Sequence, residues 1–323
     1  MLHHTILHRQ SSTGYAFKKK LFSTIILFLI AVPALTQELT KKTADSSLLS
    51  GEYLGQKPPG MLPEIFAPGI ISTCTQHSSA YFSYDGKEVY FSRLYPSPSV
   101  IMYMCEENGQ WKKPQAVCEG LTPGLSPDGM TVFFSTSKFD WKLYKIFKSP
   151  EGWTEPKILP SYINFQKRQD TPYSSNNMTL YFCSMYGKAD GIYRAALING
   201  EYMQPERIDF GLSDKYSNFS PYIAPDESYM IFSSTRPGYG ITDLFISFHK
   251  EDGNWSTPIN MGSIVNTKYK EAFPFVSFDG KYLFFMSNRP SELNEDPIPD
   301  GPGNVYWIDA KIIDELKRQS LNE

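Results

Sequence analysis

The sequence predicts an all-β fold, a β-propeller of four-stranded blades, from its composition and from an internal repeat. Of the 323 residues, 22 are Phe, 21 are Tyr, 22 are Gly and 24 are Pro, while only 20% are charged. Aromatic residues favour strands, and Gly and Pro favour the turns between them. A motif of two strands joined by a tight turn recurs at spacings of 43, 48, 50 and 53 residues, which is the range of propeller blades.

Each copy of the motif has a first strand, a turn at Asp or Asn, and a second strand rich in Phe and Tyr. The turn residues are Asp85, Asp128, Asn176, Asp226 and Asp279. Asp-Gly and Asn-Asn pairs tolerate the positive φ that a tight turn requires. A third, alternating strand follows, and a fourth begins with a W-x-x-P motif at residues 111–114, 153–156 and 255–258. Each copy is therefore predicted to form one four-stranded blade.

The last copy lacks a fourth strand, because the chain continues after Trp307 into a short helical tail, predicted for residues 311–323. Residues 63–66 match the fourth strands of the other copies in type and order. An N-terminal strand that completes the last blade would close the ring and remove an exposed sheet edge. We therefore predict five blades over residues 61–310, preceded by a linker at 37–60. Six blades stay possible, but they would need about forty further residues of strand.

The N-terminal region resembles a secretory signal peptide. Three lysines, Lys18 to Lys20, precede an apolar run over residues 21–35 that is short for a membrane span. We predict a signal peptide at residues 1–36, with an uncleaved N-terminal anchor as the alternative. Its removal would leave 27 of the 31 Lys and Arg against 34 Asp and Glu, a net charge of −7. This charge argues against nucleic acid and anionic membranes as partners, and we expect a periplasmic or secreted protein with no membrane insertion after cleavage.

Histidine and cysteine content limits the chemistry that the processed chain can perform. It would keep only His77 and His249, so a multi-histidine metal site is excluded, and no metal or other cofactor is expected. The four cysteines are expected to be mostly free thiols, although pairing of Cys74 with Cys118 stays open.

The turns carry a family resemblance. The tetrapeptide SPDG stands at residues 126–129, with near matches SYDG at 83–86 and SFDG at 277–280, each followed by an aromatic strand. In this respect the repeats over residues 63–309 resemble the PD40, or WD40-like, repeats of the TolB-like family of β-propellers. The resemblance implies a periplasmic or secreted binding scaffold, from a Gram-negative bacterium. Propellers of that family tend to have six blades, so a count of five departs from them.

Candidate ligand-binding residues follow from the register of the first strands. In a propeller these strands begin near the central axis, so the residues three positions before each strand's Pro, or its equivalent, are expected to meet at one mouth of the channel. With their neighbours and with Trp141, which lies outside the W-x-x-P register, the candidates are His77, Arg168, Gln169, Asp170, Tyr216, Asn218 and Glu271. No catalytic residue is assigned, because the sequence contains no G-x-S-x-G, HExxH, GxGxxG or P-loop motif.

Two functions are compatible with these observations. The first is a non-catalytic, exported propeller that binds a protein or glycan partner in the cell envelope. The alternative is a propeller-type polysaccharide lyase or glycoside hydrolase. A hydrolase needs two carboxylates about 5 to 10 Å apart, and Asp170 with Glu271 is the pair that the sequence nominates for that role.

Overall fold

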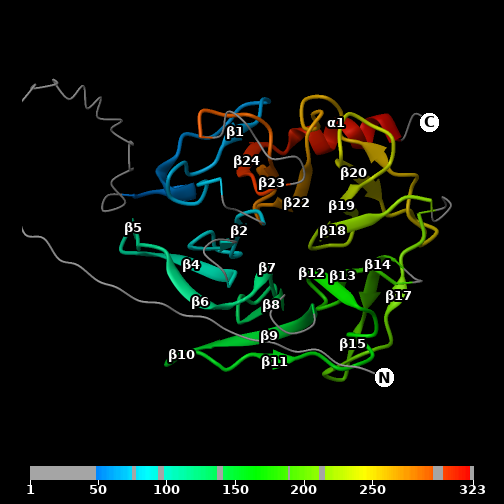
Figure 1. Cartoon of the computed structure of the whole chain (residues 1–323), viewed down its shortest axis with the longest axis horizontal. Coiled ribbons are helices and arrows are strands. Elements are labelled where there is room, and N and C mark those ends of the chain that lie inside the picture. Colours follow the sequence, from blue (N-terminus) through cyan, green and yellow to red (C-terminus); the bar gives the residue numbers. More distant parts are fainter. Residues whose placement is uncertain are drawn as a thin grey trace, which may run out of the picture. The chain divides into compact units, whose positions relative to one another are not determined.

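The structure is a computed structural model that describes residues 49–74, 78–93, 98–136, 141–187, 190–210, 215–293 and 301–320. The predicted signal peptide and His77 lie outside these residues. Figure 1 shows the described strands arranged in a ring, and their pairing gives five antiparallel sheets of four or five strands beside one separate two-stranded hairpin. We number the sheets as blades I to V in chain order.

Each blade is an antiparallel sheet in which the innermost strand is the first in sequence, and blade V takes its last strand from the N-terminal side. Blade I comprises β2 (Tyr81–Phe82), β3 (Glu88–Arg93), β4 (Val100–Glu107) and β6 (Gln115–Glu119). Blade II comprises β7 (Leu121–Leu125), β8 (Thr131–Thr136), β9 (Lys142–Ser149) and β11 (Lys157–Ile158). Blade III comprises β12 (Arg168–Ser174), β13 (Leu180–Met185), β14 (Gly191–Ala195) and β17 (Glu206–Arg207). Blade IV comprises β18 (Asn218–Ile223), β19 (Tyr229–Ser234), β20 (Asp243–Phe248) and β21 (Ile259–Asn260). Blade V comprises β22 (Glu271–Val276), β23 (Tyr282–Ser287), β24 (Asn304–Asp309) and β1 (Glu64–Ile65).

The remaining described elements are short extensions of the blades or flank them. They are η2 (Glu52–Gly55), β5 (Gln110–Trp111), β10 (Gly152–Trp153), the β15 (Leu197–Ile198) and β16 (Glu201–Tyr202) hairpin, and α1 (Lys311–Ser320). None of the helices among the described residues is long and apolar enough to cross a membrane. All four cysteines are unpaired.

The N-terminal strand β1 closes the ring, as the sequence predicted. Glu64 lies opposite Trp307 on β24, and the next residue pairs with Tyr306. The Phe66 amide then donates to the Val305 carbonyl at 2.8 Å, and the Phe66 ring is fully buried against the ring of Trp307, 5.1 Å away. The prediction of a five-bladed propeller closed by an N-terminal strand is confirmed.

Part of the segment predicted as a linker packs on the propeller. In η2, Tyr53 and Leu54 are buried, and the Tyr53 ring lies 4.9 Å from that of Tyr282. The Trp111 indole donates to the Gly51 carbonyl at 2.8 Å, so the first W-x-x-P tryptophan holds this segment in place. Residues 49–60 therefore belong to the folded unit.

Four of the five inner strands share a bulge that the sequence did not reveal. Thr122, Thr171, Ser220 and Phe273, each directly before a proline, have φ between 48° and 56°. Pairing with the second strand shifts register at each of these positions. A residue before proline is ordinarily extended, and a left-handed conformation is uncommon outside glycine. The bulge turns the start of each inner strand relative to the rest of the blade.

An aromatic layer fills the axis two residues beyond the bulge. Tyr81, Tyr173, Tyr222 and Phe275 come from four inner strands at equivalent positions, and each is at most 5% exposed. Their ring centroids lie 5.0 to 6.2 Å apart in contacting pairs. The fifth position is Gly124, where a Cβ would overlap the backbone of blade III. The layer therefore closes the channel below the bulge.

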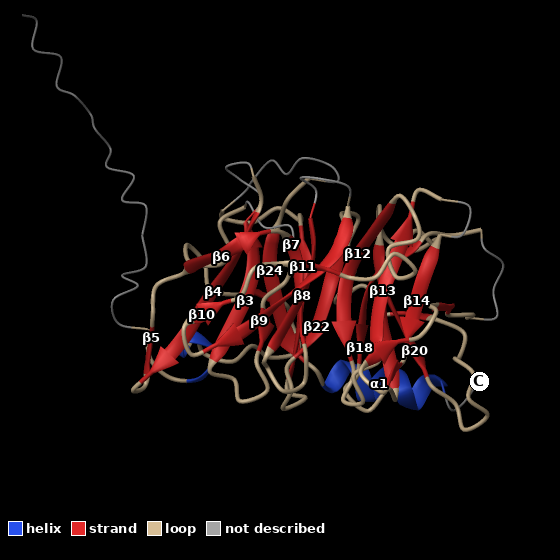
Figure 2. Ribbon diagram, turned by 90° about the horizontal axis from the view of Figure 1, so that it is seen from below, coloured by secondary structure: helices blue, strands red, loops and turns tan. Residues whose placement is uncertain are grey.

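The two ends of the propeller differ. In blade V, Glu271 pairs with Ser287 at the end where the inner strands begin, which we call the mouth. Asp309 pairs with Tyr282 at the opposite end, and α1 starts two residues later. Figure 2 shows α1 along that opposite end of the blades.

Candidate functional site

A cavity of about 710 Å³ lies on the axis at the mouth, above the aromatic layer. Its walls come mainly from blades III, IV and V and combine hydroxyl, charged and aromatic side chains. They are formed by Ser99, Leu121, Trp141, Arg168, Asp170, Thr171, Cys183, Ser184, Met185, Tyr186, Asp190, Ser217, Asn218, Phe219, Ser220, Thr235, Ile241, Thr242, Lys270 and Phe273. A concave site with a few convergent polar groups is the form that small-ligand sites take.

The structure brings half of the predicted site residues to this cavity. They are Trp141, Arg168, Asp170 and Asn218. Gln169 and Glu271 do not line the cavity, and both are fully buried. Tyr216 is also outside the lining and lies with its ring 5.8 Å from the Arg236 guanidinium.

The difference follows from the bulge in the inner strands. The sequence analysis placed the residues three before each proline at the mouth. In blades III to V, the cavity is instead lined mainly by the residues one and two positions before the proline. These residues are Asp170 with Thr171, Phe219 with Ser220, and Phe273. The left-handed residue rotates the strand, so Gln169 and Glu271 turn into their own blades.

Arg168, Asp170 and Trp141 form one structural unit in the cavity wall. Arg168 Nη2 donates to Asp170 Oδ2 at 2.7 Å, and the guanidinium lies 3.7 Å from the centre of the Trp141 ring. The Arg168 side chain is only 17% exposed. A cation over an indole face is attracted to the ring electrons, and this attraction is strongest when water is excluded. The stack and the ion pair therefore hold the guanidinium in a single position.

Asp170 accepts hydrogen bonds at both of its carboxylate oxygens. Thr122 Oγ1 and Ser135 Oγ of blade II donate to Oδ1 at 2.7 and 2.6 Å, and the Thr171 amide donates at 2.8 Å. Burial alone would raise the pKa of Asp170, but Arg168 and these hydroxyl donors outweigh it and lower the pKa below its ordinary value. Asp170 is thus held ionised and joins blades II and III.

Small residues in the second strands help to accommodate the bulges. The bulge frees the Thr122 amide from its own ladder, and that amide donates to Ser92 Oγ of blade I at 2.9 Å. Cys183 occupies the equivalent position in blade III, where its thiol donates to the Asp170 carbonyl at 3.4 Å. Burial raises the pKa of Cys183 to about 11, so the group is a neutral thiol at physiological pH.

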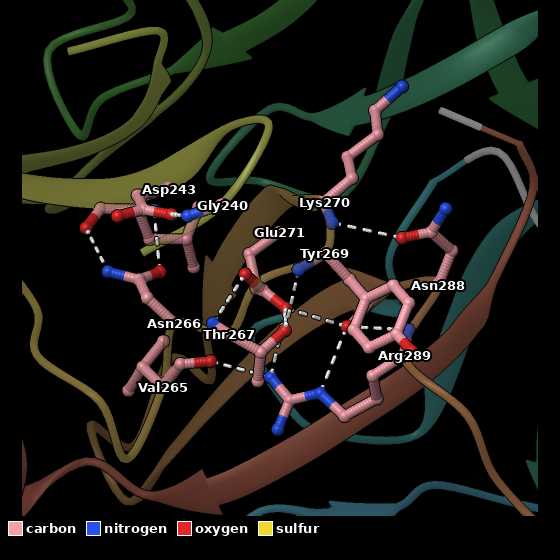
Figure 3. Close-up of polar contacts among 12 residues, drawn as sticks. Gly240, Asp243, Val265, Asn266, Thr267, Tyr269, Lys270, Glu271, Asn288 and Arg289 are labelled. Atoms are coloured by element: carbon pink, nitrogen blue, oxygen red, sulfur yellow. Dashed lines mark hydrogen bonds and ion pairs between the residues drawn. The ribbon is translucent and has the colours of Figure 1, made fainter. Parts of the chain in front are cut away.

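Glu271 is the centre of a buried cluster in blade V (Figure 3). The Thr267 amide and hydroxyl donate to its two oxygens at 2.9 and 2.7 Å, and Ser287 Oγ donates at 2.8 Å. Arg289 Nη2 completes the set at 3.2 Å. Burial raises the pKa of Glu271 even though Arg289 opposes the shift. The carboxylate therefore has a structural position inside the blade.

Blade IV repeats this arrangement with an amide. Arg236 Nη1 donates to Asn218 Oδ1 and, at 2.8 Å, to Ser234 Oγ. Blade III has Tyr186 where blades IV and V have arginine. There both amide atoms of Gln169 and the hydroxyl of Ser184, its partner in the β12–β13 register, are buried with no hydrogen-bond partner among the described residues. Blade III thus has a polar pair without the arginine that completes it in blades IV and V.

Asp243 fixes a loop that reaches the cavity, a role the sequence analysis missed. Its two oxygens accept the amides of Tyr239 and Gly240 at 2.7 and 3.0 Å, and Asn260 Nδ2 donates at 2.7 Å. Figure 3 shows part of this arrangement beside the Glu271 cluster. The next residue of the loop, Ile241, lines the cavity. The Gly-Tyr-Gly turn that ends three residues before this Asp was the available signal, because an Asp shortly after such a turn can bond its freed amides.

No three His, Cys, Asp or Glu side chains within the described ranges are grouped as ligands of a metal ion would be. The cavity residues that could interact with a charged ligand are Arg168, Lys270, Asp170 and Asp190.

Comparisons with known proteins yield structural similarity only. No family model matches the sequence, and neither does any curated protein. TolB from Acinetobacter baumannii is 17% identical with a TM-score of 0.47, over 72% of this chain and 56% of that chain. A putative TolB from Agrobacterium tumefaciens is 15% identical with a TM-score of 0.47, over 71% and 88%. The GH43 protein BlXynB from Bacillus licheniformis is 13% identical with a TM-score of 0.47, over 77% and 57%.

The chain thus spans just over half the length of the Acinetobacter protein. It has structural similarity, at low identity, both to TolB-like propellers and to propellers that are enzymes. No specific function is established by these similarities.

Proposed function

We propose that this chain is an exported, non-catalytic binding propeller of the cell envelope, and that it holds part of a glycan or protein partner in the mouth cavity. The observation that carries the proposal is the cavity of about 710 Å³, whose walls combine a fixed guanidinium, hydroxyl groups and aromatic rings. Export is proposed from the lysine triplet and apolar run of residues 1–36.

The chemistry of the cavity supports binding more than catalysis. A general acid needs a pKa near the working pH, whereas the pKa of Asp170 is lowered and its oxygens are occupied by donors. The raised pKa of Cys183 makes its thiol a poor nucleophile. Glu271, the second carboxylate nominated for a hydrolase, is bonded to Arg289 and does not line the cavity. These facts disfavour the lyase or hydrolase alternative.

The test is a glycan and peptide binding array with the purified protein, followed by titration of the best ligand. Trp141→Ala removes a cavity wall and the ring under Arg168, so we expect the affinity to fall by about 1 to 3 kcal/mol. Ile158→Ala, on the exposed β11, is the control and should leave affinity unchanged. Equal affinity of the Trp141 variant would place binding elsewhere, and turnover of a polysaccharide by the wild type would support the enzymatic alternative.

A further inference from the structure

The mouth cavity has hydrogen-bond donors that no group among the described residues uses. Arg168 donates a hydrogen bond from one nitrogen, Nη2, to Asp170. Its Nε is buried and has no partner among the described residues. The Trp141 stack and the Asp170 ion pair fix the plane of the guanidinium, so this N–H cannot turn away to water. A fixed guanidinium with unused N–H groups is suited to a planar, two-oxygen acceptor.

Ser184 supplies a second unused donor in the same wall. It is 0% exposed, it lines the cavity, and its hydroxyl has no partner within the described residues. The corresponding serines of blades IV and V, Ser234 and Ser287, each receive an arginine donor from their own blade. A buried hydroxyl without a partner costs stability, and a ligand that accepts its hydrogen bond would remove that cost.

The unused donors, rather than the net charge of the lining, favour a carboxylate as the acceptor, because the lining holds two cationic residues, Arg168 and Lys270, and two acidic ones, Asp170 and Asp190. The Asp170 charge is already compensated by Arg168 and by hydroxyl and amide donors. Lys270 adds a second cationic residue to the lining. Asp190 lines the cavity as well and is suited to accept hydrogen bonds from hydroxyl groups of the same ligand. Hydroxyl side chains such as Ser217 and Thr235 extend the polar wall.

We propose that the mouth cavity binds a carboxylate-bearing sugar, a uronic acid or a glycan that ends in one, with its carboxylate on Arg168 and Ser184. The proposal rests on the proposed function, because it names the ligand class of the same cavity. Arg168 and Ser184 are binding residues in it. Trp141 and Asp170 are positioning residues that act through Arg168.

The test compares sugars that differ only in the carboxylate. Calorimetric titrations would use galacturonate, glucuronate and mannuronate against galactose, glucose and mannose. We expect at least one uronate to bind about tenfold or more tightly than its neutral sugar, as for a hydrogen bond to a charged group. Equal affinities for every acid and its neutral partner overturn the proposal and leave the proposed function intact. Failure of all six sugars also overturns it, and if the array gives no ligand either, the proposed function falls too.

Two variants locate the carboxylate. Ser184→Ala deletes a hydroxyl that has no partner in the described part of the chain, so uronate affinity should fall about tenfold while the melting temperature stays unchanged or rises. Ser233→Ala is the matched control, because Ser233 is also a buried serine whose hydroxyl has no partner among the described residues, but it does not line the cavity. Arg168→Lys keeps a cation beside Asp170 but loses the guanidinium fork, so it should weaken the uronate more than the neutral sugar. Unchanged uronate affinity in the Ser184 and Arg168 variants overturns the assignment.

Discussion

Replacing Glu271 by alanine should destabilise the propeller strongly, although the sequence placed this residue in a solvated channel. The carboxylate is 0% exposed and accepts from Thr267, Ser287 and Arg289. Its removal leaves the Arg289 guanidinium, whose side chain is 16% exposed, without a counter-charge inside blade V. Breaking a buried ion pair from one side costs about 3 to 5 kcal/mol. At about 2 to 4 °C per kcal/mol for a large domain, the melting temperature should fall by about 6 to 20 °C.

The assay is thermal unfolding followed by circular dichroism, with two further variants. Glu206→Ala is the matched control, since Glu206 pairs with Arg194 on the surface at side-chain exposures of 69% and 46%. It should change the free energy of unfolding by less than about 1 kcal/mol. Adding Arg289→Met to the Glu271 variant removes the unpaired charge and should recover part of the loss. A melting temperature of the Glu271 variant within 2 °C of wild type would refute the cluster and restore the channel-facing assignment.

Three further predictions concern closure, packing and pH. Deleting residues 61–66 unpairs β24 and should lower the melting temperature more than deleting the chain from residue 311, and equal losses would contradict closure by β1. Gly124→Ala places a methyl group against the backbone of blade III and should cost about 1 to 3 kcal/mol in urea unfolding, whereas Gly60→Ala meets no atom within 4 Å and should be neutral. The pKa of Asp170 is lowered in the folded state, so its stabilisation is present above the unfolded value of about 3.9 and is lost as the pH falls through the folded value. The free energy of unfolding of Asp170→Asn should therefore be lower than wild type at pH 7 but decline less steeply between about pH 5 and pH 2, and parallel pH profiles would exclude this linkage.

The sequence was sufficient for the blade count and the closure because both depend on local, repeated signals. The turns illustrate this: Ser126 Oγ donates to Asp128, and Asp128 in turn accepts the Met130 amide at 2.9 Å. These bonds link residues two apart, so they repeat wherever the tetrapeptide does. The match between residues 63–66 and the fourth strands likewise needed only pattern and order.

The site was predicted less well because its register depends on a backbone conformation that the sequence disfavours. Thr171 and Ser220 precede prolines and should be extended, yet both are left-handed. Hydrogen bonds from other blades stabilise that conformation, as when Thr122 Oγ1 of blade II accepts the Thr171 amide at 3.3 Å. Trp141 and Arg168, which line the cavity, were nominated because one broke a repeat and the other flanked a strand start. No local sequence signal marks Ser184, because its lack of a partner among the described residues depends on which side chains the blade register places beside it.

The aromatic layer across the axis closes the channel below the cavity, so the cavity has no exit through the ring. Tyr173, Tyr222 and Phe275 of this layer do not line the cavity, and each is almost completely buried. A molecule in the cavity must leave through the mouth by which it entered, because nothing can pass through the ring from one side to the other. Under the proposed function, a long polymer therefore cannot pass through the ring, and only the part of it that enters the mouth contacts the cavity residues.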